Sequence, residues 1–131
     1  MLQVELVSPE KILYSGEAEM VIARTAGGDI AFLTGHAPFL GALGIGQVRI
    51  RTGGGEEVAA VHGGFVEVSA NRVTILSDVA ELAADIDVAR AQSAKDRLER
   101  QADVLEDAEA EAALRRAHVR LQVATGTPAT H

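Results

Sequence analysis

The chain has 131 residues, a formal net charge of −7 and no cysteine. Its length allows one domain with an appendage or two very small domains, and its acidic balance argues against general nucleic-acid binding. Neither a disulfide framework nor a cysteine metal site can form, and no run of residues approaches the roughly 18 apolar residues of a membrane span.

The first two thirds of the chain predict short β-strands separated by turns. Residues 2–6 alternate apolar and polar side chains, as a half-buried strand does. Further strands are expected at 11–14, 17–25, 30–33, 47–51, 56–61, 63–68 and 72–76, with a break at Ser15-Gly16 and turns at 27–29, 53–55 and 70–71. Residues 1–84 are therefore expected to form an all-β sandwich or flattened barrel.

The sequence changes character near residue 85. Twelve of its thirteen glycines and all three phenylalanines precede residue 66, whereas Ala, Arg, Asp, Glu and Leu dominate from residue 80 onward. Apolar residues then recur at helical spacing in two stripes, Ala91, Ala94, Leu98, Ala102 and Leu105, and Ala110, Ala113, Leu114, Ala117, Leu121 and Ala124. Asp87 is the expected N-cap of the first helix, and the second is expected to begin near Glu106-Asp107. Residues 85–131 thus predict an antiparallel helical hairpin with a frayed C-terminus.

Six short segments carry a family likeness in one continuous order. They read GHAPFL at 35–40, GQVRI at 46–50, GGFVEV at 63–68, VTIL at 73–76, IDVARA at 86–91 and ALRRA at 113–117. Together they resemble the epsilon subunits of bacterial F-type ATP synthases, and the likeness covers residues 2–124.

The resemblance implies a ten-stranded β-sandwich and a helical hairpin in the central stalk of a proton-translocating synthase. Residues 1–84 would bind the gamma subunit and the c-subunit ring, so that the chain turns with the rotor. Residues 85–131 would be a regulatory arm that either lies folded beside the body or extends into the alpha/beta catalytic head and inhibits ATP hydrolysis. The subunit would perform no chemistry, require no cofactor or metal, and reach the cytoplasmic face of the bacterial cell membrane only through the complex.

A group of arginines on the hairpin suggests an anion site. Arg90, Arg97 and Arg120 each precede a position of a helical stripe, so an antiparallel pair of helices brings them to one groove. Like charges in one groove repel unless an anion lies between them, and guanidinium groups suit phosphate oxygens.

The family resemblance gives this groove a ligand. Epsilon subunits that bind ATP use an (Ile/Leu)-Asp-x-x-Arg-Ala motif with arginines on both helices. The matching positions here are Glu81, Asp87, Arg90, Arg97, Arg116 and Arg120. The resemblance therefore implies regulatory ATP. The alternative is a solvated basic flank that Glu99 or neighbouring acids neutralise.

Three positions match contacts of the family with other subunits. Asp29, expected in a glycine turn, matches an acid that faces a basic loop of the c subunit. Ser8 and His36 match positions near the gamma interface. Each has a plainer interpretation, because Asp is common in turns and a single histidine is more often structural.

An enzyme and a free-standing nucleotide sensor are the two alternatives to a rotor subunit. His36, His62, His118 and His131 are scattered, and no serine lies in a nucleophile-elbow sequence. No spacing of residues resembles a set of metal ligands. A sensor built on the hairpin arginines remains open, and it predicts an isolated chain where the rotor interpretation predicts co-purification with gamma.

Overall fold

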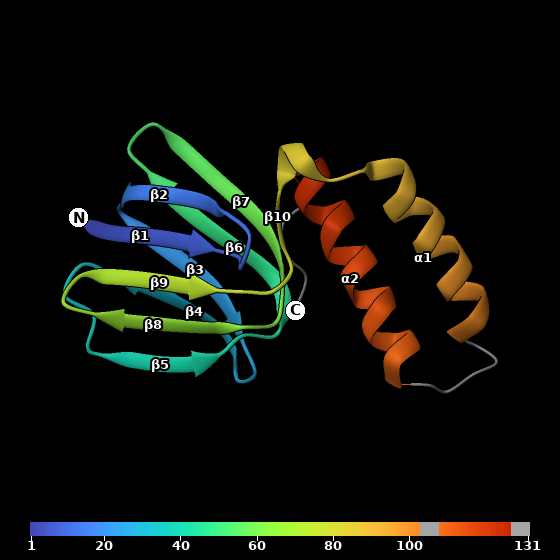
Figure 1. The fold of residues 1–131 in the computed structure, drawn as a ribbon, viewed down its shortest axis with the longest axis horizontal. Coiled ribbons are helices and arrows are strands. Elements are labelled where there is room, and N and C mark those ends of the chain that lie inside the picture. The colour runs from blue at the N-terminus through green and yellow to red at the C-terminus, as the bar shows by residue number, and fades with distance from the viewer. Residues whose placement is uncertain (103–107, 127–131) are drawn as a thin grey trace.

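In a computed structural model of the protein, which describes residues 1–102 and 108–126, a β-sandwich carries two helices at one end (Figure 1). The strands are β1 (Leu2–Val7), β2 (Ile12–Ala18), β3 (Met20–Thr25), β4 (Gly28–Leu33), β5 (Phe39–Ala42), β6 (Ile45–Thr52), β7 (Gly55–His62), β8 (Phe65–Ser69), β9 (Arg72–Leu76) and β10 (Ala80–Leu82). A short 3-10 helix, η1 (Ala83–Asp85), leads into α1 (Val88–Ala102) and α2 (Ala108–Thr125). The expected fold class is confirmed.

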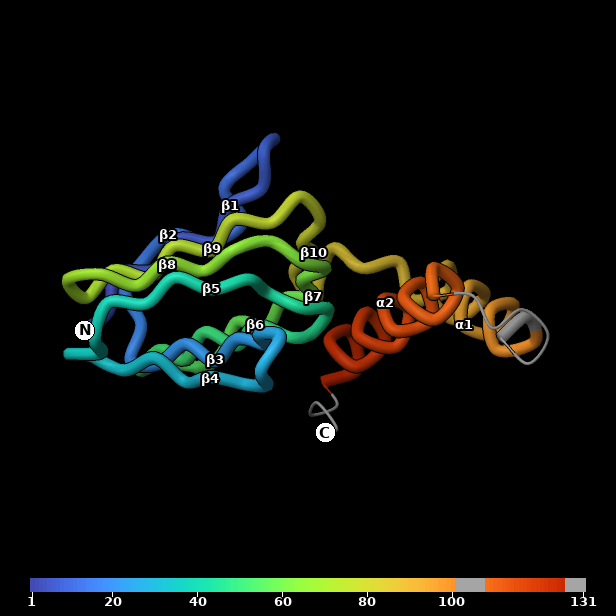
Figure 2. Tube along the Cα trace, turned by 90° about the horizontal axis from the view of Figure 1, so that it is seen from below, coloured from blue at the N-terminus to red at the C-terminus, as the bar shows by residue number. Residues whose placement is uncertain are grey.

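The ten strands form two five-stranded sheets that pack face to face (Figure 2). One sheet has the order β2-β1-β9-β8-β5 and the other β10-β7-β6-β3-β4. Neighbouring strands are antiparallel except for the parallel pair β1 and β9. This pair places the first strand of the body beside one of its last strands. Residues far apart in the sequence of the body are therefore neighbours in this sheet.

The sandwich has its own hydrophobic core. Strand β1 shows how it is built, because Leu2, Val4 and Leu6 point inward and are fully buried while the residues between them face solvent. The fully buried side chains of the other strands, among them Phe32 and Ile50, complete the core. All sixteen buried members of this cluster precede residue 76, so the core needs no side chain from the helices.

The structure corrects the expected break at Ser15-Gly16. Both residues lie inside β2, where they pair with Glu5 and Val4 of β1. The break falls at Glu19, whose N–H donates to the carbonyl of Arg51 in the other sheet. The chain thus changes sheets at Glu19, and the glycine at position 16 stays in the strand because its ladder partners are retained.

Two strands were not predicted, and one turn was misplaced. Strand β5 lies within and beyond the GHAPFL segment and pairs with β8, and β10 lies where the composition already turns helical and pairs with β7. Asp29 is the second residue of β4, opposite Arg24 of β3, and the turn itself is at Ala26-Gly27. Pairing with a neighbouring strand determines all three features, and local composition does not reveal it.

The helices begin and end largely as their sequence signals indicate. The side-chain carboxylate of Asp87 accepts the N–H of Arg90 over 3.0 Å, which confirms the expected N-cap. Helix α2 ends before Gly126, which has the left-handed φ of 75° typical of a residue that follows a helix. The expected start of the second helix at Glu106-Asp107 lies outside the described residues.

Helix α2 docks on the outer face of β6 and β7, and α1 packs against the far side of α2 (Figure 1). The contact is a small apolar cluster in which Ala60, Ile86, Val119 and Val123 are buried. This cover explains why Ala59, Ala60 and Val61 are all buried, where a strand with one wet face would alternate.

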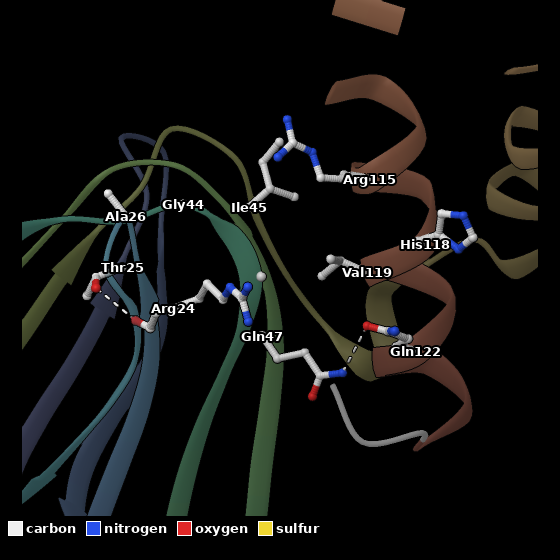
Figure 3. Close-up of a pocket in the computed structure, with 12 residues that line it drawn as sticks. Arg24, Thr25, Ala26, Gly44, Ile45, Gln47, Arg115, His118, Val119 and Gln122 are labelled. Atoms are coloured by element: carbon white, nitrogen blue, oxygen red, sulfur yellow. Dashed lines mark hydrogen bonds between the residues drawn. The ribbon is translucent and has the colours of Figure 1, made fainter. Parts of the chain in front are cut away.

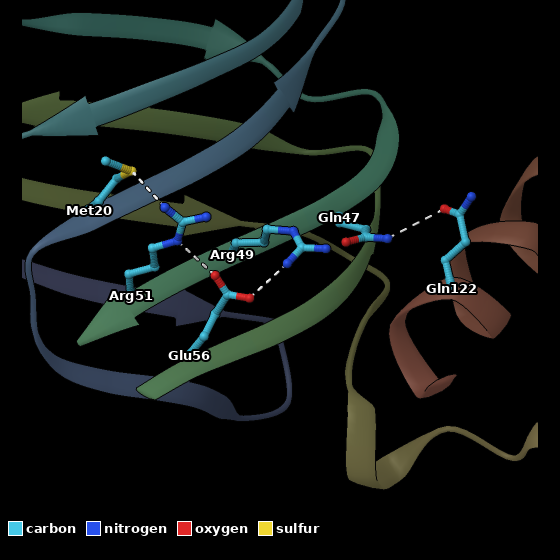
Figure 4. A network of polar contacts seen from close by, with 6 residues as sticks. All are labelled: Met20, Gln47, Arg49, Arg51, Glu56 and Gln122. Atoms are coloured by element: carbon cyan, nitrogen blue, oxygen red, sulfur yellow. Dashed lines mark hydrogen bonds and ion pairs between the residues drawn. The ribbon is translucent and has the colours of Figure 1, made fainter. Parts of the chain in front are cut away.

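Polar side chains lie on the same outer face of the sheet, at and beyond the edge of the part that α2 covers (Figure 4). Gln47 donates to Gln122 of α2 over 3.4 Å. Further along, Glu56 accepts hydrogen bonds from Arg49 at 2.7 Å and from Arg51 at 2.9 Å. No helix among residues 1–102 and 108–126 is both long and apolar enough to cross a membrane.

Candidate functional site

The hairpin arginines line one groove between the two helices and the end of the sandwich. Its cavity measures about 480 Å³. All six residues proposed for nucleotide binding contribute to its walls, namely Glu81, Asp87, Arg90, Arg97, Arg116 and Arg120. We refer to this cavity as the arginine groove. The prediction that Arg90, Arg97 and Arg120 share one groove is confirmed.

Small side chains make room for the groove. Its floor includes Ala91, Ala94, Ala113 and Ala117, which come from the two facing stripes. Ala91 and Ala117 are 3% and 2% exposed, so the helices approach closely at these positions. Because alanine fills little of the space between the helices, the longer arginines at the flanks stand above an open channel.

Two of the four arginines already have carboxylate partners. Nε of Arg120 lies 2.6 Å from Oε1 of Glu81, and a terminal nitrogen of Arg116 lies 2.8 Å from Glu109. Arg90 and Arg97 are exposed and form no ion pair with a carboxylate of the described residues. Glu99, the expected neutralising acid, instead lies 3.7 Å from Lys95 and 4.0 Å from His118. Within the described part of the chain, two guanidinium groups of the groove therefore remain without an ion pair, although Asp85 and Asp87 line the same groove.

A buried histidine lies behind the groove. The side chain of His62, at the end of β7, is 2% exposed, and its Nε2 lies 3.7 Å from Glu81. Neither ring nitrogen has a hydrogen-bond partner within the described part of the chain. Burial and the nearby Arg120 lower the pKa of His62 to about 4, against the opposing effect of Glu81. The imidazole is therefore neutral at pH 7.

The three positions expected to contact other subunits lie apart. Ser8 follows β1 and borders a groove of about 360 Å³ with Phe65 and Leu76, which are 59% and 52% exposed. Asp29 is the second residue of β4 in the opposite sheet and lies 3.5 Å from Arg24. His36 follows the other end of β4.

His36 is packed as a structural residue. Its Nδ1 lies 2.7 Å from the carbonyl of Ala37, and its ring meets Phe32 edge-on with centroids 5.0 Å apart. These contacts fix the loop between β4 and β5, and they agree with the plainer interpretation of this histidine.

Sequence reasoning missed the role of His62 and a second cavity on the other side of α2. His62 is adjacent to Gly63-Gly64 and shares the outer face of the sheet with Ala60, since side chains of one strand alternate. That alternation could have placed it at the helix contact. The second cavity depends on which body residues α2 covers, which no local pattern indicates. Among the described residues, no group of three or more His, Asp or Glu side chains could hold a metal ion.

Comparison with known sequences places this architecture among ATP synthase subunits. Residues 1–83 match the family described as ATP synthase, Delta/Epsilon chain, beta-sandwich domain. An ATP synthase epsilon chain from Streptomyces coelicolor is 50% identical over 126 residues, which cover 95% of this chain and 96% of the relative.

Solved structures with the same fold come from larger assemblies. A chain of the Euglena gracilis mitochondrial ATP synthase, solved with OSCP, F1 and the c-ring, superposes with a TM-score of 0.81 at 21% identity and covers 95% of this chain and 81% of its own length. A chain of the Tetrahymena thermophila mitochondrial ATP synthase central stalk and c-ring gives a TM-score of 0.58 at 17% identity, with 97% and 96% covered. At these identities the likeness establishes the fold.

Proposed function

This chain belongs to the family of ATP synthase epsilon chains and is a non-catalytic subunit, and we propose that it connects the c-ring to gamma in the central stalk and regulates ATP hydrolysis through its helices. The observation that carries the proposal is the 50% identity to an epsilon chain across both the sandwich and the helices. In this role the subunit is peripheral to the cytoplasmic face of a bacterial membrane and reaches the proton-translocating ring only through protein contacts.

The sandwich supplies the surfaces for the rotor. The groove beside Ser8 exposes Phe65 and Leu76, and exposed apolar side chains that are close together suit a protein partner. We assign this surface to gamma. Asp29 is exposed at the start of an edge strand and suits a basic loop of the c subunit.

The rotor assignment is tested by co-purification. A tagged full-length chain should retain gamma, and Phe65→Ser should weaken that association, while Ile12→Ser on an exposed apolar residue of β2 serves as the matched control. Asp29→Asn should lower coupling in the reconstituted synthase more than Glu57→Gln. A chain that purifies alone would favour the free-standing nucleotide sensor.

The helices suit a regulatory arm because their contact with the body is small. Burial of Val119, Val123, Ile86 and Ala60 contributes on the order of 5 kcal/mol as an upper estimate. Loss of conformational freedom in the linker and the helices opposes this contribution. A docked and an undocked arm therefore differ by a few kcal/mol, which is the range in which a ligand or a partner shifts the population. In the undocked state the arm extends to the alpha/beta head.

The arginine groove is the proposed site of regulatory ATP. Arg90 and Arg97 lack carboxylate partners among the described residues, and the groove is large enough for a triphosphate. ATP between the helices would neutralise their charge and favour the packed hairpin. Magnesium ATP should bind at millimolar concentration or below in calorimetry. Arg97→Gln should weaken binding about tenfold, as expected for one charged hydrogen bond.

A matched control separates the groove from general charge. Arg100→Gln removes the same charge from the same helix outside the groove and should leave ATP binding unchanged. An equal loss in both variants, or no heat and no change in melting temperature with the wild-type chain, excludes the nucleotide part of the proposal. The rotor assignment would stand in either case.

A further inference from the structure

A second cavity lies on the opposite side of α2, between that helix and the end of the sandwich (Figure 3). It measures about 500 Å³. Its walls include Arg24, Gly44, Gly46 and Gln47 of the body and Arg115 and Gln122 of α2. No aspartate or glutamate is among the described residues that line it. We refer to it as the interface pocket.

Glycine at position 46 allows Arg24 to reach this pocket. A Cβ at Gly46 would lie 2.6 Å from Cβ and 2.8 Å from Cγ of Arg24, closer than carbon atoms approach. The stem of Arg24 therefore crosses β6 over a position that only glycine can occupy. Gly44, two residues earlier, is not required in this way, because its Cβ would make an ordinary contact of 3.9 Å with Cγ of Arg24. Gly46 thus fixes the path of the arginine toward α2.

Two guanidinium groups from different parts of the molecule face the same space. The side chains of Arg24 and Arg115 extend from the strand and from α2 toward the gap between them (Figure 3). Arg24 forms an ion pair with Asp29 over 3.5 Å, and this carboxylate does not line the pocket. Arg115 is exposed and forms no ion pair with a carboxylate of the described residues. An anion in the space that both side chains line would interact favourably with both guanidinium groups.

We propose that the interface pocket binds a phosphate group, either as inorganic phosphate or as a phosphate monoester, between Arg24 of the body and Arg115 of α2. Guanidinium forks match phosphate oxygens in geometry and charge. Gln47 and Gln122, already joined across the same contact, border the site with polar groups. Because its ligand contacts both the body and the arm, the site favours the docked arm.

This site is distinct from the arginine groove. Arg115 and Gln122 line the interface pocket and not the groove, whereas Arg116 and Arg120 line the groove and not the pocket. A ligand of the interface pocket contacts α2 and the body, whereas a ligand of the groove also contacts α1. The two sites can therefore be occupied and tested separately.

The test is a phosphate titration of the full-length, isotope-labelled chain followed by NMR. Amide signals of Gly44 and Gly46 should shift to saturation with a dissociation constant of roughly 1–10 mM, and sodium chloride at equal ionic strength should not reproduce the shift. Arg24→Gln and Arg115→Gln should each weaken binding about tenfold, the loss expected for one charged hydrogen bond. Arg97→Gln, in the arginine groove, should leave it unchanged.

A second titration, with AMP, identifies the source of the phosphate group. Saturation by AMP at lower concentration than inorganic phosphate assigns the site to a monoester, and the reverse order assigns it to the free anion. The proposal is overturned if neither ligand saturates the signals, if Arg115→Gln binds as tightly as the wild type, or if Arg97→Gln abolishes the shifts. Arg115 is exposed on a helix, so its replacement does not endanger folding.

Gly46→Ala tests the positioning of Arg24. It should weaken phosphate binding to the level of Arg24→Gln and leave ATP binding unchanged. Gly54→Ala is the matched control, because a Cβ at that exposed turn glycine meets no atom within 4 Å. Full phosphate affinity in a folded Gly46→Ala variant would show that Arg24 does not contribute from this position.

Discussion

Glu56 shows how a single carboxylate organises two cations on the outer face of the sandwich. It accepts hydrogen bonds from Arg49 and Arg51, and these arginines lie two residues apart on the same face of β6 (Figure 4). The hydrogen bond from Arg51, with the charge of Arg49, lowers the pKa of Glu56 from its ordinary value of 4.5. Without the carboxylate, two like charges would remain side by side.

The first prediction concerns this carboxylate. Glu56→Gln should lower the free energy of unfolding at pH 7 by about 0.5–1 kcal/mol, a modest loss because the pair is partly solvated. The stabilisation is present above pH 4.5 and is lost as pH falls through the lowered pKa of the folded state. Urea unfolding at pH 7 measures this free energy of unfolding. Glu57→Gln, at an exposed neighbour, should lower it by less. Equal losses of stability in the two variants would contradict the role assigned to Glu56.

The second prediction concerns His62. Burial behind Glu81 and Arg120 lowers its pKa to about 4 in the folded protein, whereas an exposed histidine titrates near 6.5. The unfolded or undocked state therefore binds more protons between these values. Stability is complete above pH 6.5 and declines as pH falls toward 4, by at most about 1.4 kcal/mol per pH unit for one proton.

Replacement of His62 isolates this effect. His62→Gln should reduce the pH dependence of unfolding between pH 6.5 and 4, and His118→Gln, at a half-exposed histidine of α2, should not. Denaturant titrations at several pH values give the slope. If wild type and His62→Gln lose stability in parallel, the histidine is already accessible to solvent or protonated in the docked state.

At the scale of the element, much of the sandwich could be predicted from the sequence. Strands β1, β6 and β9 have alternating apolar and polar residues and are bounded by turn residues. Asp87 likewise marked the start of α1. Strand β5 could not be predicted, since it is an edge strand with partly exposed side chains that only its pairing with β8 defines. Strand β10 has three residues and no buried one, so it too depends on its neighbour.

The site residues divide in the same way. Helical spacing alone placed Arg90 and Arg97 on one face, and it also predicted that an antiparallel partner would bring Arg120 to them. The interface pocket could not be found, because Arg24 and Arg115 are 91 positions apart and meet only through the docking of α2. A packing contact between modules leaves no periodic signal in either one.

The third prediction concerns the element that joins arm and body. Val123 is 3% exposed in the contact with the sheet, and Val123→Ala should destabilise docking by about 2 kcal/mol through lost burial. The undocked population should then rise by roughly tenfold or more. Limited proteolysis of the linker between β10 and α1 reports this population. Val88→Ala, at a half-exposed valine of α1, should leave the cleavage rate unchanged, and equal rates in all three chains would refute a docking role for Val123.

At the scale of the whole molecule, the sandwich and the helical arm are stabilised by different interactions. Among the residues that the structure describes, every buried side chain of the main core belongs to the sandwich, whereas the arm is attached by one small cluster and a few polar contacts. A rigid body that keeps its fold in either position of the arm suits a subunit fixed to a rotor. A weakly docked arm suits a regulator, since its equilibrium lies within the reach of nucleotide, phosphate or a partner.

The last prediction separates these parts by two changes that act in opposite directions on ATP hydrolysis. A chain ending after residue 86 keeps the whole sandwich core and should still bind gamma, but it lacks the arm and should no longer inhibit the reconstituted ATPase. Val123→Asp keeps the arm but places a charge in the apolar contact with the sheet, so the arm should undock and inhibit more strongly than the wild type. ATPase rates of complexes with matched subunit content measure both effects. A sandwich that regulated hydrolysis by itself would leave the truncated chain inhibitory, and an arm that acted only when docked would make Val123→Asp less inhibitory.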